Sequence, residues 1–142
     1  VQVDAETGRL INSTRSCVAQ TTGVAAPNGF WFQACQIANT PWTEGVYAAD
    51  LHNNRRRWNS GLPCPAYDSP LLALRSKTLL VPCRDGLMIL DAITGNKLLS
   101  YVLGGRISSP AIVDGKIYVA VTDYASWDSG LLVGNVSLVC LG

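Results

Sequence analysis

The five-residue pattern D-A-x-T-G occurs twice in this chain, as Asp4-Ala5-Glu6-Thr7-Gly8 and as Asp91-Ala92-Ile93-Thr94-Gly95. A degenerate copy begins at Asp50, so the three aspartates are separated by 46 and 41 residues. Periods of roughly 40–50 residues are typical of single four-stranded blades in propeller-type repeat proteins. The repeat therefore predicts a series of similar β-units.

The repeated pattern has the composition of a tight turn between two strands. Aspartate and threonine side chains can bond backbone groups within a turn, and glycine adopts positive φ without steric cost. In each unit we expect this turn to join the third strand, C, to the fourth strand, D. The residues predicted to form these turns are Asp4, Thr7, Gly8, Asp91, Thr94 and Gly95.

The segments between the aspartates repeat as well. Residues 28–35, 76–83 and 114–121 align without a gap, and in each a turn is followed by an apolar run that predicts strand B. Ser-Pro pairs at 69–70 and 109–110 predict the start of strand A, where a proline removes no ladder hydrogen bond. We interpret residues 21–28 and 126–134 as insertions, and we expect no helix.

The predicted fold class is all-β, with about three four-stranded propeller-type blade units at about residues 13–58, 59–103 and 104–142. Residues 1–12 supply the end of a strand C and a strand D, whereas the last unit supplies only strands A to C. We expect the last blade to be completed by an N-terminal strand from another chain, or by the continuation of a larger propeller. The partners expected are accordingly other copies of the chain or the rest of that propeller.

Residues 90–98 (LDAITGNKL) and 104–119 (GGRISSPAIVDGKIYV) resemble the repeat of the pyrroloquinoline-quinone (PQQ) enzyme family. They are equally similar to the cofactor-free PQQ-like propellers that share this repeat. The resemblance implies a tryptophan in strand D that docks between blades, and among Asn12, Trp58 and Leu99 at that position only Trp58 matches. It also implies, for the enzymes, PQQ and calcium on the propeller axis beside a catalytic aspartate. No residue here maps individually onto those ligands.

The chain contains five cysteines. Cys17 and Cys64 hold equivalent positions near the start of strand A, and Cys35 and Cys83 hold equivalent positions at the end of strand B. Because the start of A faces the end of B in an antiparallel pair, we predict the disulfides Cys17–Cys35 and Cys64–Cys83. A Cys35–Cys64 bond and free thiols in a reducing cell are the alternatives. Cys140 is left over as a buried thiol or an intermolecular partner, and the third unit has Gly105 and Val121 at the matching positions.

Two glycosylation sequons, at Asn12 and Asn135, together with the cysteines favour an extracellular or extracytoplasmic location. A net charge of +1 gives no field that would attract nucleic acid or an anionic membrane. We interpret Arg55-Arg56-Arg57 as a solvated strand edge or turn. The sequence contains no apolar run of about 20 residues, so we expect no membrane span.

Candidate chemistry is sparse. His52 is the single histidine and has no cysteine nearby in sequence, so neither a zinc site nor a Ser-His-Asp set is expected. Asp123, Trp127 and Asp128 could line an axial mouth, or they belong to an insertion loop. We therefore expect a non-catalytic extracellular binding or structural module without a cofactor, which assembles by strand complementation, for example as a fibre subunit. The alternative is a fragment of a PQQ-dependent alcohol or sugar dehydrogenase.

Overall fold

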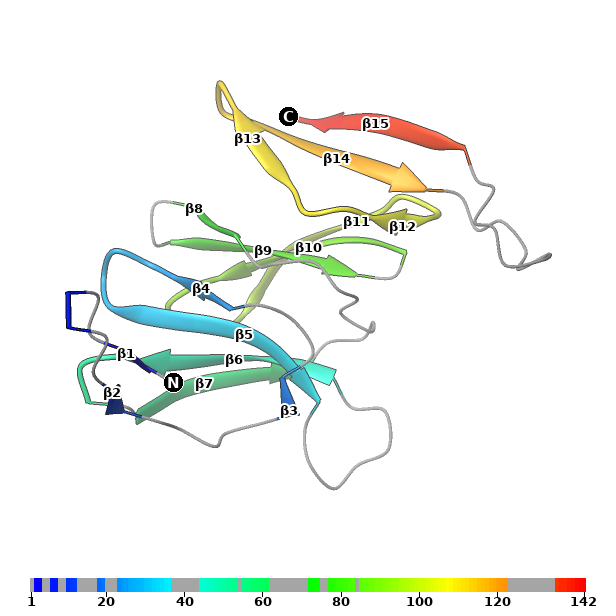
Figure 1. The fold of residues 1–142 in the computed structure, drawn as a ribbon. Coiled ribbons are helices and arrows are strands. Elements are labelled where there is room, and N and C mark those ends of the chain that lie inside the picture. The colour runs from blue at the N-terminus through cyan, green and yellow to red at the C-terminus, as the bar shows by residue number, and fades with distance from the viewer. Residues whose placement is uncertain are drawn as a thin grey trace, which may run out of the picture.

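The computed structural model describes residues 2–3, 6–7, 10–12, 18–19, 23–36, 44–53, 55–61, 72–74, 77–83, 85–122 and 135–142. Within these ranges the chain forms 15 β-strands and no helix, and every strand pair is antiparallel. Figure 1 shows three sheets stacked face to face in chain order. The prediction of an all-β protein is confirmed. The three stacked sheets are antiparallel and have three or four strands each, when two short segments that pair with one strand are counted as one. The described residues do not form a closed propeller.

The first and second sheets both contain strands in the order A-B-C-D. In the first sheet, strand A is split into β3 (Val18–Ala19) and β4 (Val24–Ala25), which both pair with β5 (Phe30–Gln36). Strand B of this sheet, β5, pairs with β6 (Glu44–Asp50), which is strand C, and β6 pairs with β7 (Arg55–Gly61), which is strand D. The second sheet contains β8 (Leu72–Leu74), β9 (Thr78–Cys83), β10 (Gly86–Asp91) and β11 (Lys97–Val102).

The third sheet contains strands A to C. Strand A is again split, into β12 (Arg106–Ile107) and β13 (Ala111–Val113), and both pair with β14 (Lys116–Thr122). On its other side β14 pairs with β15 (Val136–Leu141). The turn from β13 to β14 has positive φ at Asp114 (49°) and Gly115 (75°), as a two-residue hairpin turn requires.

Strand A differs from the sequence prediction in two places. Pro110 does not start the strand but lies between β12 and β13, where its missing N–H interrupts the ladder. The neighbouring Ser108 maintains the contact with β14: its N–H donates to the Ala120 carbonyl, and its hydroxyl accepts from the Ala120 N–H. In the first sheet, the expected insertion at 21–28 contains β4.

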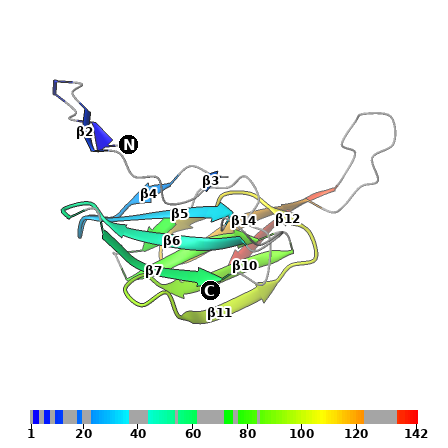
Figure 2. The same cartoon turned by 90° about the horizontal axis from the view of Figure 1, so that it is seen from below.

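A short hairpin, β1 (Gln2–Val3) with β2 (Leu10–Asn12), forms a separate two-stranded sheet. Within the described part of the chain, neither of its strands contacts any other strand, and Figure 2 shows it standing away from the stack. Its ladder shifts register between Gln2 and Val3. The same irregularity occurs in the other two C–D pairs, between Ala48 and Ala49 and between Ile89 and Leu90.

This shared bulge identifies β1–β2 as a C–D hairpin of the same repeat. In each of the three hairpins the shift begins two residues before the turn aspartate. The residues opposite that position are Asn12, Trp58 and Leu99. Those are the three positions aligned from the sequence, so the ladders support the repeat alignment independently of residue similarity.

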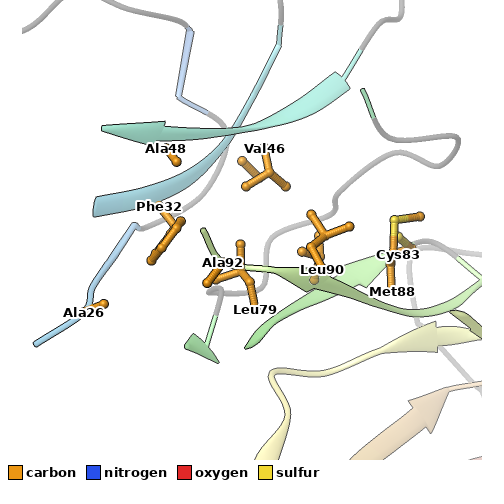
Figure 3. Packing of buried hydrophobic residues seen from close by; sticks show 11 residues of the cluster. Ala26, Phe32, Val46, Ala48, Leu79, Cys83, Met88, Leu90 and Ala92 are labelled. Atoms are coloured by element: carbon orange, nitrogen blue, oxygen red, sulfur yellow. The ribbon is translucent and has the colours of Figure 1, made fainter. Parts of the chain in front are cut away.

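Two apolar clusters lie between the sheets. The cluster between the first and second sheets, shown in Figure 3, includes Phe32, Val46, Leu79 and Leu90, each with 0% of its surface exposed. The cluster between the second and third sheets is built from Leu80, Leu87, Ile89, Ile107, Val119 and Val121. Because alternate residues of a strand point to opposite faces, the apolar runs of β9 and β10 bury both faces of the second sheet.

Candidate functional site

The turn at Asp91 is closed by its own side chains. The Asp91 Oδ1 atom accepts hydrogen bonds from the backbone N–H groups of Ile93 and Thr94, both at 2.8 Å. The Thr94 hydroxyl accepts from the Asn96 N–H at 3.3 Å, and Gly95 has a φ of 77°. The N–H of Thr94, followed by that of Ile93, lowers the pKa of Asp91 below its ordinary value. All of these carboxylate contacts lie within the turn.

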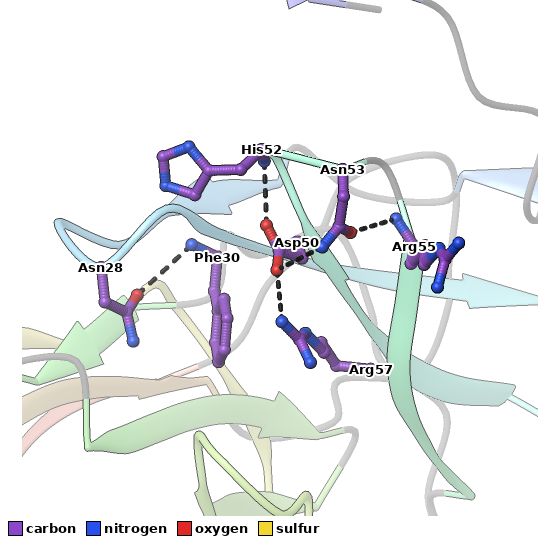
Figure 4. A network of polar contacts seen from close by, with 7 residues as sticks. All are labelled: Asn28, Phe30, Asp50, His52, Asn53, Arg55 and Arg57. Carbon is purple, nitrogen blue, oxygen red and sulfur yellow. Dashed lines mark hydrogen bonds and ion pairs between the residues drawn. The ribbon is translucent and has the colours of Figure 1, made fainter.

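Asp50 makes an analogous turn with different partners, shown in Figure 4. Its Oδ1 accepts from the backbone N–H of His52 at 2.9 Å, while its Oδ2 accepts from the Asn53 side-chain amide at 3.1 Å and forms an ion pair with Arg57. The Arg57 hydrogen bond, followed by the His52 N–H, lowers the pKa of Asp50. The side chain of Asp50 is buried and accepts three hydrogen bonds, so its geometry is that of a turn anchor and not of a general base.

The three consecutive arginines of β7, Arg55 to Arg57, are exposed, and Arg57 also contacts this turn. All three arginines are exposed to some degree, but Arg57 bonds Asp50 and its guanidinium carbon lies 5.7 Å from the centroid of the Phe30 ring. Nothing in the arginine run itself marks Arg57 as the partner of Asp50. The signal available was the absence of the Thr-Gly pair after Asp50, which leaves the carboxylate to be satisfied by other donors.

Trp58 connects the first sheet to the turn of the second. Its indole N–H donates to the carbonyl oxygen of Ala92 at 3.1 Å, and its ring centroid lies 5.8 Å from that of Phe32. A Cβ atom placed on Gly95 would come within 2.6 Å of the Trp58 ring. Glycine at this position therefore provides both the positive φ of the turn and the space for the indole. Leu99, at the equivalent position of the second sheet, is 46% exposed.

A small cavity of 170 Å³ lies on the second sheet, around the β10–β11 pair. Its volume is below the roughly 300–1,000 Å³ of ordinary ligand sites. Its lining includes Asp85, Lys97, Ser100 and Tyr101, beside the apolar Leu87 and Val102. Lys97 and Asp85 flank it with opposite charges, and this donor set does not form a nucleophile–base pair.

The predicted cysteine pairs fall partly outside the described residues. Cys17 and Cys64 lie outside them, Cys83 is disulfide-bonded, and Cys140 is a free, exposed thiol. Both pairings therefore stay predictions. The register supports the proximity on which they depend, because Ala19 lies opposite Cys35 and a Cβ on Gly105 would lie 2.9 Å from Val121 Cγ1.

The remaining candidate residues are dispersed. Asn135 is exposed and immediately precedes β15, whereas Asn12 ends β2, so the two sequons lie beside different sheets. Asp4, Gly8, Asp123, Trp127 and Asp128 lie outside the described residues. In the described ranges, His, Cys, Asp and Glu side chains nowhere gather in a group of three or more that could hold a metal ion. Those ranges also contain no helix of the length and apolarity needed to cross a membrane.

Comparisons with protein-family models and with curated proteins find no match for this chain. Function is therefore inferred from the chain's own geometry: the repeated C–D turns, the contacts between sheets, and the sheet edges that no other described strand covers.

Proposed function

We propose that this chain is a non-catalytic, extracytoplasmic PQQ-like propeller-repeat module that assembles by strand complementation. The observation that carries the proposal is the mismatch between its C and D strands. The third sheet ends at β15, a strand C, and β15 pairs only with β14 among the described strands. The β1–β2 hairpin carries a strand D that belongs to no described sheet except its own.

The edge of β15 suits the addition of a strand. An unpaired edge presents a row of backbone N–H and C=O groups, which recruit another strand unless they are covered. Two of its side chains are large and apolar, Val136 at 67% exposure and Leu138 at 75%. In the first two sheets the equivalent strands, β6 and β10, are covered on this side by β7 and β11.

The β1–β2 hairpin has the properties of a donor. An isolated two-stranded hairpin is only marginally stable in water, so this hairpin gains stability when it joins a larger sheet. Its bulge lies at the same place as the bulges of the other C–D pairs. Strand β2 therefore has the geometry of a strand D that pairs with a strand C. The acceptor is the third sheet of another copy or a sheet in the remainder of a larger propeller.

The first test removes residues 1–12 and measures native mass by light scattering. We expect the full chain to form species heavier than its 15.2 kDa protomer, and the native mass to fall when residues 1–12 are removed. A synthetic peptide of residues 1–14 should then bind the truncated chain, and its scrambled version should not. An unchanged native mass after truncation contradicts strand donation.

The non-catalytic part of the proposal is tested against the alternative, a fragment of a PQQ-dependent alcohol or sugar dehydrogenase. The chain is incubated with PQQ and calcium and then passed through a desalting column. We expect the eluted protein to show no quinone absorbance. Stoichiometric quinone that elutes with the protein, and that is lost when calcium is chelated, would establish the enzyme alternative instead.

The extracytoplasmic part of the proposal predicts carbohydrate at the exposed Asn135. Expression through a eukaryotic secretory pathway should give a chain whose mass falls on treatment with peptide N-glycosidase, and Asn135→Gln should remove part of that difference. Asn59→Gln, in exposed β7 and outside a sequon, is the matched control. A secreted chain of unmodified mass contradicts glycosylation.

A further inference from the structure

The three B–C strand pairs place equivalent residues on one face of each sheet. The registers match: Phe32 lies opposite Ala48, Leu80 opposite Ile89, and Tyr118 opposite Cys140. Two residues along strand B, the pairs are Ala34 with Val46, Pro82 with Leu87, and Ala120 with Leu138. We call this side of each sheet its forward face, because in the first two sheets it packs against the next sheet in the chain.

Burial on the forward face differs sharply between the units. Val46 and Leu87, at one shared position, are 0% and 1% exposed, because the second and third sheets cover them. Leu138 holds the same position in the third sheet and is 75% exposed. Cys140 is exposed as well, whereas Ala48 and Ile89 at its position are buried. The forward face of the third sheet thus has the composition of a packed interface without a sheet on it.

The residues of this face belong to one surface. Tyr118 and Cys140 lie directly opposite each other across the β14–β15 ladder, and the neighbouring Cys140 thiol raises the pKa of Tyr118. Val113 (54% exposed) and Val136 (67% exposed) extend the patch along β13 and β15, and the exposed Lys116 opposite Val113 bounds it. Contiguous exposed apolar surface of this kind marks protein–protein contact in soluble proteins.

The other end of the stack carries the complementary face. In the second sheet, Leu79 and Met88 pack against the first sheet. In the third sheet, Ile117 and Val139 hold the same positions and pack against the second sheet. In the first sheet these positions are occupied by two aromatic residues, Trp31 and Tyr47, both partly exposed. One chain therefore displays both halves of the interface that it already uses twice internally.

We propose that a second copy of this chain packs its first sheet, through Trp31 and Tyr47, onto the forward face of the third sheet around Leu138. This contact goes beyond strand complementation, because it uses side chains on a sheet face and not the backbone edge of β15. Since the two surfaces differ, the contact is heterologous and builds either a closed ring or an open filament. The forward faces of the first two sheets are each covered by another sheet of the same repeat. We therefore expect a sheet of this repeat to cover the forward face of the third sheet as well.

The test measures self-association of the full chain by sedimentation velocity. Leu138→Lys should weaken association at least about tenfold, because a charge would be buried in the contact. Val102→Lys is the matched control, since Val102 is 86% exposed on β11 and away from both faces. If Leu138→Lys impairs folding by circular dichroism, Val136→Lys on the same face replaces it. A wild-type chain that stays monomeric at every concentration reached, or equal association of the Leu138→Lys and Val102→Lys chains, overturns the proposal.

A mixing experiment identifies the partner surface. Tyr47→Lys should also weaken association at least about tenfold. When residues 1–12 are removed from both chains, so that no strand can be donated, Leu138→Lys and Tyr47→Lys chains mixed together should form a dimer and nothing larger, because one intact interface remains. If Tyr47→Lys associates normally, two forward faces meet each other and the head-to-tail arrangement is wrong. Site-resolved alkylation of Cys140 gives an independent readout: its labelling should slow as wild-type concentration rises and should not slow for Leu138→Lys.

The outcome separates this contact from strand donation. If removal of residues 1–12 abolishes association and Leu138→Lys leaves association unchanged, the result supports strand donation and contradicts the stacked face. Loss with Leu138→Lys alone supports the stacked face and contradicts strand donation. Loss with both changes supports two contacts in one assembly.

Discussion

The indole N–H of Trp58 donates to the carbonyl oxygen of Ala92, 3.1 Å away, and so ties strand D of the first sheet to the C–D turn of the second. The Ala92 side chain is buried in the cluster between these sheets. Because the turn's conformation is set by Asp91 and Gly95, the repeat motif acts at two levels. It reverses the chain, and it shapes the site at which the preceding sheet docks.

Replacing Gly95 with alanine tests this double role. Alanine would adopt the positive φ of 77° at a cost of about 1–2 kcal/mol, and its Cβ would in addition displace the Trp58 ring. Gly104→Ala is the matched control, because Gly104 has a similar φ of 73° and nothing lies within 4 Å of its Cβ position. Urea denaturation should show a larger loss for Gly95→Ala. Equal losses would mean that close approach of the indole does not constrain position 95.

Trp58→Phe isolates the hydrogen bond from the packing. Phenylalanine retains an aromatic ring beside Phe32 but has no N–H to donate, so the Ala92 carbonyl loses its side-chain donor. We expect a decrease in unfolding free energy of about 1–2 kcal/mol, measured by denaturant titration. Trp58→Ala should cost about 3–5 kcal/mol because it also opens a cavity. A Trp58→Phe chain as stable as wild type would show that the bond contributes nothing.

Acid should weaken the fold through the two turn aspartates. The pKa values of Asp50 and Asp91 are lowered in the folded chain. Their stabilising contribution is therefore fully present above the unfolded value of about 3.9 and is lost as pH falls through the folded values. Asp91→Asn should flatten the dependence of unfolding free energy on pH in this window. Asp114→Asn, in the exposed β13–β14 turn, controls for net charge. An Asp91→Asn profile parallel to wild type contradicts this assignment.

The strands and the C–D turns could be predicted from the sequence because both depend on local pattern. The aspartates marked the turns even at Asp50, where the rest of the motif has diverged, since a carboxylate can bond whichever donors the turn supplies. The partners across units were not predictable. The bond of Trp58 to Ala92 and the ion pair of Arg57 with Asp50 depend on how strands meet in space. The break of strand A at Pro110 was missed because Ser-Pro is equally compatible with a strand start.

Disulfide mapping tests the pairing of equivalent cysteines. Alkylation without reduction should label only Cys140, and peptide mapping should recover Cys17–Cys35 and Cys64–Cys83. Each bond closes a short loop and is worth about 3 kcal/mol in the chain-entropy model, so Cys64→Ser with Cys83→Ser should lower unfolding free energy by about that amount. Cys140→Ser is the control. A recovered Cys35–Cys64 peptide would replace the predicted connectivity.

Replacement by alanine should affect stability to very different extents at two leucines that hold the same repeat position. Leu87 is 1% exposed between the second and third sheets, and Leu138 is 75% exposed at the corresponding position of the third. In dilute solution, Leu87→Ala should lower the unfolding free energy by about 2–5 kcal/mol, because it leaves a cavity in the cluster. Leu138→Ala should change it by no more than about 0.5 kcal/mol. At concentrations where copies associate, Leu138→Ala should also become destabilising, since the melting temperature of an associating chain rises with concentration. Denaturation curves recorded across protein concentrations check both parts. A Leu138→Ala effect of several kcal/mol already in the monomer would mean that this face is covered within a single chain.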